Sequence, residues 1–145
     1  ALLAAIADQL RIDMATIVDA QWIANGPGWI GVMLASAEAV LAVRPGIIDE
    51  DIALIGSSPD GVEQAFEVRA FFPKDGATAE DPVTGSANAS LAQWCIESGY
   101  ATPPYRVRQG AALRRCGIVH IDTDAEGTVW VGGGTITGVT GSVVL

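Results

Sequence analysis

The segment Glu80-Asp81-Pro82-Val83-Thr84-Gly85-Ser86 carries the strongest structural signal in this chain of 145 residues. Pro82 fixes its own φ and favours an extended conformation at Asp81. Ser86 stands where the N-cap of a helix is expected. The residues that follow, 87–98, are apolar on most sides, which is typical of a buried helix. The segment therefore predicts a carboxylate-bearing loop that runs directly into a central buried helix.

The start of such a helix is suited to binding an anion. Its first turn has unpaired N–H groups and the positive end of the macrodipole. Gly85 permits backbone turns that other residues resist and adds no side chain, so an anion can approach the backbone. Asp81 lies a few residues upstream, where it would overhang a bound carboxylate as a proton carrier or hydrogen-bond acceptor. The alternative is that Asp81 and Ser86 only cap the helix.

Strands are expected on both sides of this helix. Alternating or short apolar runs between turn signals predict them at 16–24, 29–34, 52–55, 63–72, 105–109, 117–123, 128–132 and 142–145. The turn at 25–28 predicts a hairpin, and 73–85 is expected to be a loop. Short helices are expected at 2–10 and 36–43, the second with Ser36 as N-cap. The fold class is α+β, a mostly antiparallel sheet wrapped around one central buried helix, in a single domain of residues 1–145.

Composition excludes several functions. The formal net charge is −9, so the basic surface that nucleic-acid binding requires is absent. His120 is the only histidine and no metal-ligand spacing occurs, so neither a metal site nor a nucleic-acid partner is expected. The apolar start of the chain ends at Asp8, which fits neither a signal peptide nor a membrane span. We therefore expect no membrane partner and a cytoplasmic location.

The remaining chemically distinctive residues have structural explanations. His120 lies in an alternating run, where we expect it on the polar face of a strand. Cys95 and Cys116 are expected either as two free thiols or as one disulfide. Cys95 follows Ser86 along the helix by about 13 Å, too far to be a catalytic thiol at the same site. The four tryptophans are expected in the core or in an interface, since half of all residues are hydrophobic.

The stretch Glu80–Ala87 resembles the signature of the PhzF-like family, the phenazine-biosynthesis isomerase and its relatives. Similarity extends to residues 25–45, 69–73 with 75–76, 91–99, 109–110 with Arg115, and 131–141. The resemblance implies one half of a diaminopimelate-epimerase-like fold, in which two similar domains enclose the active site in a cleft. This chain corresponds to the second, C-terminal domain. The glutamate and histidine that the family's first domain supplies have no counterpart here.

The resemblance also implies roles for individual residues. Asp81 corresponds to the acidic residue that faces the substrate, and Ser86 to a contact with its carboxylate, so both are assigned to catalysis. Asn88 stands where many relatives have histidine. The implied substrate-binding residues are Thr84, Gly85, Ser86, Ala87 and Asn88.

Two functional hypotheses follow. In the first, the chain is the C-terminal half of a PhzF-like isomerase that transfers a proton on a small carboxylate substrate without a cofactor. In the second, it is a non-catalytic carboxylate-binding or assembly domain that has lost the catalytic first half. Under either hypothesis a homodimer or a separate N-terminal half is expected to cover the start of the central helix.

Overall fold

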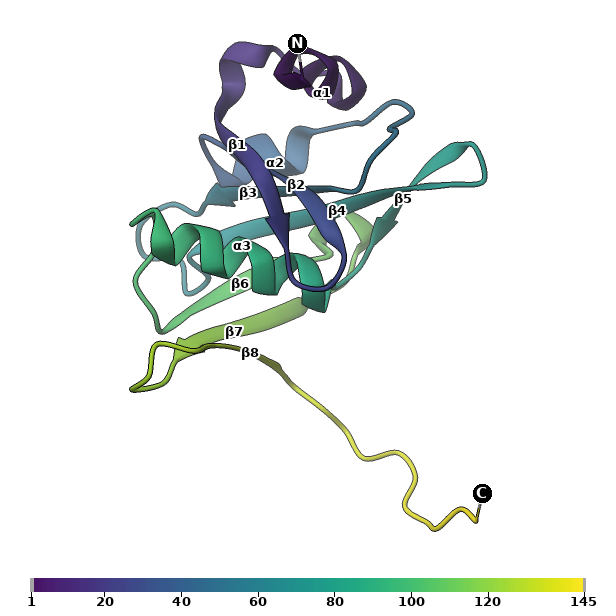
Figure 1. Ribbon diagram of the computed structural model, residues 1–145, viewed down its shortest axis with the longest axis vertical. Coiled ribbons are helices and arrows are strands. Elements are labelled where there is room, and N and C mark those ends of the chain that lie inside the picture. The colour runs from purple at the N-terminus through teal and green to yellow at the C-terminus, as the bar shows by residue number, and fades with distance from the viewer. Residues whose placement is uncertain (1, 145) are drawn as a thin grey trace.

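The computed structural model describes residues 2–144 and has one mixed sheet with helices on both faces (Figure 1). The strands are β1 (Ile17–Ala24), β2 (Gly28–Leu34), β3 (Ile52–Ser57), β4 (Phe66–Lys74), β5 (Ala77–Asp81), β6 (Tyr105–Gln109), β7 (Gly117–Thr123) and β8 (Val129–Gly133). The helices are α1 (Leu2–Leu10), α2 (Ala37–Ala42) and α3 (Gly85–Glu97), with 3-10 turns η1 (Met14–Thr16) and η2 (Ala111–Leu113).

The strands follow the order β1-β2-β3-β4-β6-β7-β8, and β5 pairs with β4 off this path. Two pairs, β2 with β3 and β4 with β6, are parallel, and the others are antiparallel. The predicted hairpin around residues 25–28 is confirmed, because β1 and β2 are antiparallel neighbours. The expected α+β class with a mostly antiparallel sheet is also confirmed.

Helix α3 lies against one face of the sheet and forms the larger core with it. Leu91 and Trp94 are almost fully buried, together with inward-facing residues of six strands, such as Ile55, Val68 and Val107. The helix ends where predicted, at Gly99, whose φ of 75° is the left-handed conformation that glycine adopts at helix ends. The prediction of a buried central helix is therefore confirmed.

A second layer covers the other face of the sheet. Residues of α1 and α2, including Leu10 and Val40, form a separate core with Leu54 and Phe71 of the sheet. Figure 1 shows α1 and α2 on the far side of the strands from α3. Ser36 caps α2 as predicted, because its Oγ accepts a hydrogen bond from the N–H of Ala39. The description of a sheet around one helix omits this layer.

The prediction of a loop over residues 73–85 is wrong. This segment contains a hairpin, because β4 continues to Lys74 and β5 spans Ala77–Asp81. The turn between them has positive φ at Asp75 (51°) and Gly76 (75°). An Asp-Gly pair is a sequence signal for such a hairpin turn, and the prediction of a loop did not use it. The hairpin places Asp81 at the end of a strand instead of in a flexible loop.

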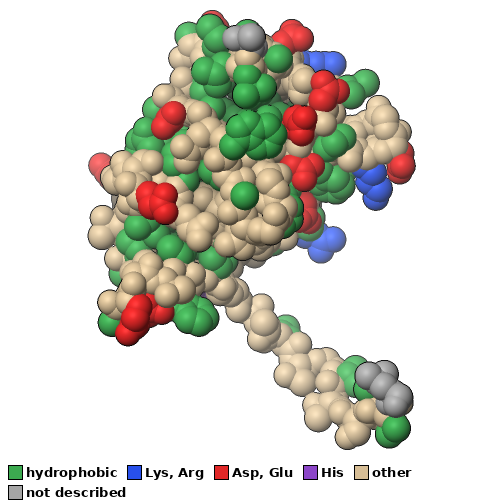
Figure 2. All heavy atoms as spheres, viewed as in Figure 1, with side chains coloured by type: hydrophobic (Ala, Val, Ile, Leu, Met, Phe, Trp, Pro, Cys, Tyr) green, Lys and Arg blue, Asp and Glu red, His purple; other side chains and the backbone are tan. Residues whose placement is uncertain are grey.

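The strand expected at residues 142–145 is not formed in the described part. Residues 134–144 have no regular structure, and Leu145 lies outside the described residues. Figures 1 and 2 show this segment extending away from the body of the molecule. Val143 is 80% exposed, so the apolar residues that predicted a strand find no sheet here.

The structure decides the state of the two thiols and the burial of the four tryptophans. Cys95 and Cys116 are both free, which removes the disulfide alternative. Trp29 and Trp94 belong to the core, whereas Trp22 and Trp130 are largely exposed. In residues 2–144, no helix has the length and apolar character needed to cross a membrane.

Candidate functional site

The site begins at the end of β5, where two successive acidic residues face opposite sides of the sheet. Asp81 pairs with Ala70, which belongs to the α3-side core, whereas Glu80 pairs with Phe71 of the α2-side core. Since side chains alternate along a strand, Asp81 is directed towards α3. Glu80 instead forms a buried ion pair with Arg69 on the far side.

The N-cap of α3 is Thr84 and not Ser86. Gly85 is the first helical residue, and Ser86 already lies inside the first turn. The Oγ1 of Thr84 makes no capping bond but donates to Oδ2 of Asp81 at 2.8 Å. The prediction of Ser86 as the N-cap is therefore wrong, because the helix begins at Gly85. The hydroxyl of Thr84, the actual N-cap, holds the Asp81 carboxylate.

Gln109 at the end of β6 holds this arrangement together from the core. Its Nε2 donates to the carbonyl of Asp81 and to Oγ1 of Thr84, both at 3.0 Å. Its Oε1 accepts from the N–H of Thr84 at 3.0 Å and from Nδ2 of Asn88 at 2.7 Å. Gln109 is completely buried. One amide therefore fixes the strand end, the cap and the first turn of α3.

Asn88 is the buried inner member of this network. Its Nδ2 also donates to the carbonyl of Thr84 at 2.8 Å, and only 2% of the residue is exposed. Its Oδ1 is buried and has no hydrogen-bond partner among the described residues. Asn88 thus braces Thr84, while one acceptor remains unsatisfied beneath the first turn.

Ser86 is held from a different strand of the sheet. Its Oγ accepts a hydrogen bond from Nε1 of Trp29 on β2 at 3.2 Å. Its carbonyl accepts from Oγ of Ser90 at 2.5 Å. Because the indole orients Oγ by donating to it, the hydroxyl hydrogen of Ser86 remains available to an acceptor.

The first turn of α3 carries unpaired N–H donors in Gly85 and Ser86, which reach the surface, and in Ala87, which is buried. The N–H groups of Gly85, Ser86 and Ala87 have no protein acceptor within residues 2–144, as expected for the first turn of a helix. Gly85 is exposed, and a Cβ built on it would meet nothing within 4 Å. Its φ is not in the left-handed region, so its predicted role as a special turn residue is wrong. The open space at Gly85 lets a ligand approach the donors of Gly85 and Ser86.

The segment 110–117 packs against the back of this loop. A Cβ on Gly117 would lie 2.2 Å from Cγ2 of Val83, and one on Gly110 would lie 2.6 Å from the carbonyl oxygen of Pro82. These close approaches fix the backbone between Asp81 and Thr84.

Comparison with known proteins agrees with this architecture. Residues 2–141 match the sequence profile of the PhzC-PhzF family, described as phenazine biosynthesis-like proteins. The chain belongs to the PhzC-PhzF family. The resemblance of Glu80–Ala87 to the PhzF signature is thereby confirmed at the level of the family.

Individual relatives show the same family and fold. An uncharacterised isomerase of Pasteurella multocida is 30% identical over 130 residues, which cover 88% of this chain and 45% of the relative. A PhzF-family phenazine biosynthesis protein of Enterococcus faecalis has 25% identity and a TM-score of 0.66, covering 89% of this chain and 46% of that one. A structure of Pseudomonas aeruginosa named a predicted epimerase has 21% identity and a TM-score of 0.69, covering 90% and 49%.

This PhzF-family chain therefore spans about half the length of the relatives that it matches. The shared architecture is consistent with one half of a two-part fold, as the sequence implied.

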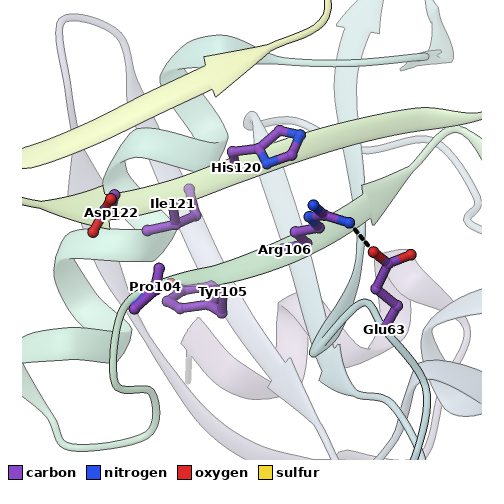
Figure 3. Close-up of a pocket in the computed structure, with 7 residues that line it drawn as sticks. All are labelled: Glu63, Pro104, Tyr105, Arg106, His120, Ile121 and Asp122. Carbon is purple, nitrogen blue, oxygen red and sulfur yellow. Dashed lines mark hydrogen bonds and ion pairs between the residues drawn. The ribbon is translucent and has the colours of Figure 1, made fainter.

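Two chemically distinctive residues of the PhzF-family chain lie outside the site. His120 is exposed on β7, as predicted, and lines a cavity of about 380 Å³ with Arg106 and Glu63 on the sheet face opposite α3 (Figure 3). Cys95 is fully buried within α3, and burial raises its pKa to about 12. No cluster of metal-ligating side chains occurs in residues 2–144.

The structure adds two residues that had no predicted role in the site, Gln109 and Trp29. Gln109 follows Tyr105 and Val107 at inward positions of β6, so alternation alone places a polar residue in the core. That signal could have identified it. Nothing in the sequence near Trp29 indicates its bond to Ser86, which is 57 positions away.

Proposed function

We propose that this chain is the C-terminal half of a PhzF-like isomerase that transfers a proton on a small carboxylate substrate. The observation that carries the proposal is the first turn of α3, where the N–H groups of Gly85, Ser86 and Ala87 are free and Asp81 is held beside them. Membership of the PhzC-PhzF family and the name of the Pasteurella relative support the same reaction class.

The free N–H groups and the hydroxyl of Ser86 would bind the substrate carboxylate. Backbone donors fixed in a helix do not need to reorganise when charge develops, so they stabilise an anionic intermediate as well as the bound carboxylate. Thr84, Gln109 and Asn88 act as positioning residues, since they contact the backbone and one another.

Asp81 is the candidate acid/base group of this half. Thr84 donates to its Oδ2, and Oδ1 has no bond to a protein group within residues 2–144. One oxygen is therefore oriented while the other is available for a proton. The reaction needs a second proton-transferring group on the opposite side of the substrate, and this would come from the remainder of the protein. The proposal includes no cofactor.

The open first turn of α3 also requires a cover to exclude water. A separate N-terminal half or a second copy of this chain would provide this cover. The proposal also includes a role in phenazine biosynthesis and a cytoplasmic location. Light scattering at micromolar concentration tests the second copy, because a monomer would leave only the N-terminal half.

Binding is tested first, by titrating the chain with acetate and sulfate and recording amide NMR shifts. We expect shifts at Gly85, Ser86 and Ala87. Ser86→Ala should weaken binding by about 1 kcal/mol, the scale of one hydrogen bond. Asp81→Asn should strengthen it, because a neighbouring negative charge is removed. Unmoved amides at millimolar anion would contradict the site.

Catalysis is tested in a full-length protein that contains this half. Small carboxylates with an acidic C–H bond are incubated in D₂O, and incorporation of deuterium is followed by mass spectrometry. Asp81→Asn should depress exchange although it improves anion binding. The alternative function, carboxylate binding without catalysis, predicts anion binding but no deuterium exchange in the full-length protein or in its Asp81→Asn variant.

A further inference from the structure

A second cavity lies on the sheet face opposite α3, between the end of α2 and η2. It has a volume of about 490 Å³ and is lined by Leu41, Arg44, Arg69, Ala111 and Ala112. The sheet separates it from the first turn of α3, since Glu80 and Arg69 face this side and Asp81 faces the other. The cavity is therefore distinct from the candidate active site.

Arg69 is buried in the floor of this cavity and is not fully satisfied. Its Nε and Nη2 donate to the two carboxylate oxygens of Glu80 at 2.9 and 2.7 Å. Its Nη1 donates to the carbonyls of Val40 and Val43 at 3.2 and 2.7 Å. A guanidinium has five N–H donors, so one hydrogen on Nη2 has no acceptor among the described residues. Only 5% of the side chain is exposed, which leaves the cavity as the place where an acceptor could lie.

Arg44 adds a positive charge that no carboxylate of the described residues neutralises. Its Nη1 donates to the carbonyls of Leu41 and Val43, whereas Nε and Nη2 have no acceptor within residues 2–144. No carboxylate of the described chain forms a salt bridge with it. Glu80 neutralises Arg69, so the cavity carries one uncompensated positive charge in a chain whose net charge is −9.

The remaining wall of the cavity is apolar. Leu41, Ala111 and Ala112 have aliphatic side chains, and Arg44 and Arg69 line the same cavity. Pockets for small molecules combine a mostly apolar lining with a few polar groups that fix orientation. Two arginines with spare donors match a carboxylate, which planar guanidinium groups bind well.

We propose that this cavity is a second binding site, for a small organic carboxylate with an apolar body. The carboxylate accepts hydrogen bonds from Arg44 and from the spare N–H of Arg69, and the apolar body lies against Leu41 and the two alanines. An inorganic anion would use the arginines only and would leave the apolar wall in contact with water.

Benzoate is the probe. Acetate serves as the comparison, because it has the same carboxylate but no large apolar body. Amide NMR shifts at Ala111 and Ala112 report this cavity, and shifts at Gly85, Ser86 and Ala87 report the first turn of α3. We expect benzoate to move the amides of Ala111 and Ala112 at lower concentration than acetate does. If benzoate leaves them unmoved at about 10 mM, the affinity is too weak for a site and the proposal is wrong.

Variants separate the two sites. Ala112→Glu places a carboxylate at the exposed rim of the cavity and should weaken benzoate binding there by about tenfold through like-charge repulsion. It should leave the shifts at Gly85–Ala87 unchanged. Ser86→Ala should do the reverse, so failure of the second site and failure of the active-site proposal are distinguishable.

Arg44→Gln removes the uncompensated charge and should also weaken binding at Ala111 and Ala112. The matched control is Arg106→Gln, which removes an arginine from a different cavity of the same sheet face. A thermal melt verifies that each variant is folded. Benzoate affinity that is unchanged in both Ala112→Glu and Arg44→Gln would overturn the proposal.

Discussion

Gln109 and Thr84 exchange two hydrogen bonds of equal length across 25 positions of sequence. The amide oxygen accepts from the Thr84 N–H, and the amide nitrogen donates to Oγ1, each at 3.0 Å. In a capping box, the N–H of the N-cap residue is satisfied by a side chain from the first helical turn. Here Gln109 from a core strand satisfies it, and the hydroxyl of Thr84, which makes no capping bond, holds Asp81.

Gln109→Leu should therefore destabilise the protein strongly. It leaves Thr84 N–H and the Nδ2 group of Asn88 with fewer acceptors in the core, at about 2–4 kcal/mol in total. Urea unfolding measures the loss. The control is Gln93→Leu on α3, which breaks no side-chain hydrogen bond and should change stability by less than about 0.5 kcal/mol. Equal losses in the two variants would contradict the bracing role of Gln109.

The glycines around the loop should respond in opposite ways. Gly117→Ala forces a methyl group to 2.2 Å from Val83 and 2.8 Å from the carbonyl oxygen of Gln109, so we expect a cost of about 2 kcal/mol or more. Gly85→Ala meets open space and should leave stability unchanged or slightly raised. It should nevertheless weaken acetate binding, because the methyl group covers the free amides. A loss of stability in Gly85→Ala would contradict this reading of the site.

The two cysteines should differ sharply in reactivity. Burial raises the pKa of Cys95 to about 12, so its thiolate is scarce and unreachable in the folded protein, whereas Cys116 is exposed. Ellman's reagent at pH 8 should titrate one thiol in the native protein and both after unfolding. Cys116→Ser should abolish the native reaction. A reactive Cys95 in that variant would show that α3 opens readily.

Glu67 should make stability depend on pH. It is 1% exposed, one carboxylate oxygen lacks a partner, and burial raises its pKa although the hydrogen bond from Arg108 lowers it. Because the folded pKa exceeds the unfolded one, the cost of burying the charge is absent below the ordinary glutamate pKa and appears as pH rises through the folded value.

Glu67→Gln should therefore gain stability relative to wild type at neutral pH, and this gain should shrink as pH falls through that window. Urea midpoints at several pH values measure it. Arg108→Gln removes the group that lowers the pKa of Glu67, so the window should extend to higher pH. A constant difference between wild type and Glu67→Gln at all pH values would contradict the assignment.

Much of the fold could be predicted because the signals are local. The hairpin at residues 25–28, the cap at Ser36 and the stop at Gly99 each depend on residues within one turn of chain. The buried character of residues 87–98 follows from composition alone. These features persist whatever the rest of the chain does.

The site could be predicted only in part, because its geometry depends on distant partners. The sequence indicated Ser86 as the cap by spacing, whereas Thr84 takes that position and Gln109 satisfies its N–H from another strand. Glu80 and Asp81 look equivalent in sequence. They have opposite surroundings because strand pairing places Glu80 against Arg69 and Asp81 beside α3.

The sheet has a narrow seam between β4 and β6. Only Phe66 with Val107, Glu67 with Arg108 and Val68 with Gln109 pair across it, whereas β6, β7 and β8 are joined to one another over their full lengths. Val107, Val119 and Ile121 of β6 and β7 also pack in the α3-side core. We expect these strands to open as a cooperative unit when both the seam and this packing separate, and hydrogen exchange would register that event in their amides together. Because Gln109 lies on the seam, we expect the same opening to release Thr84, so the anion site should persist only while the two parts of the sheet stay joined.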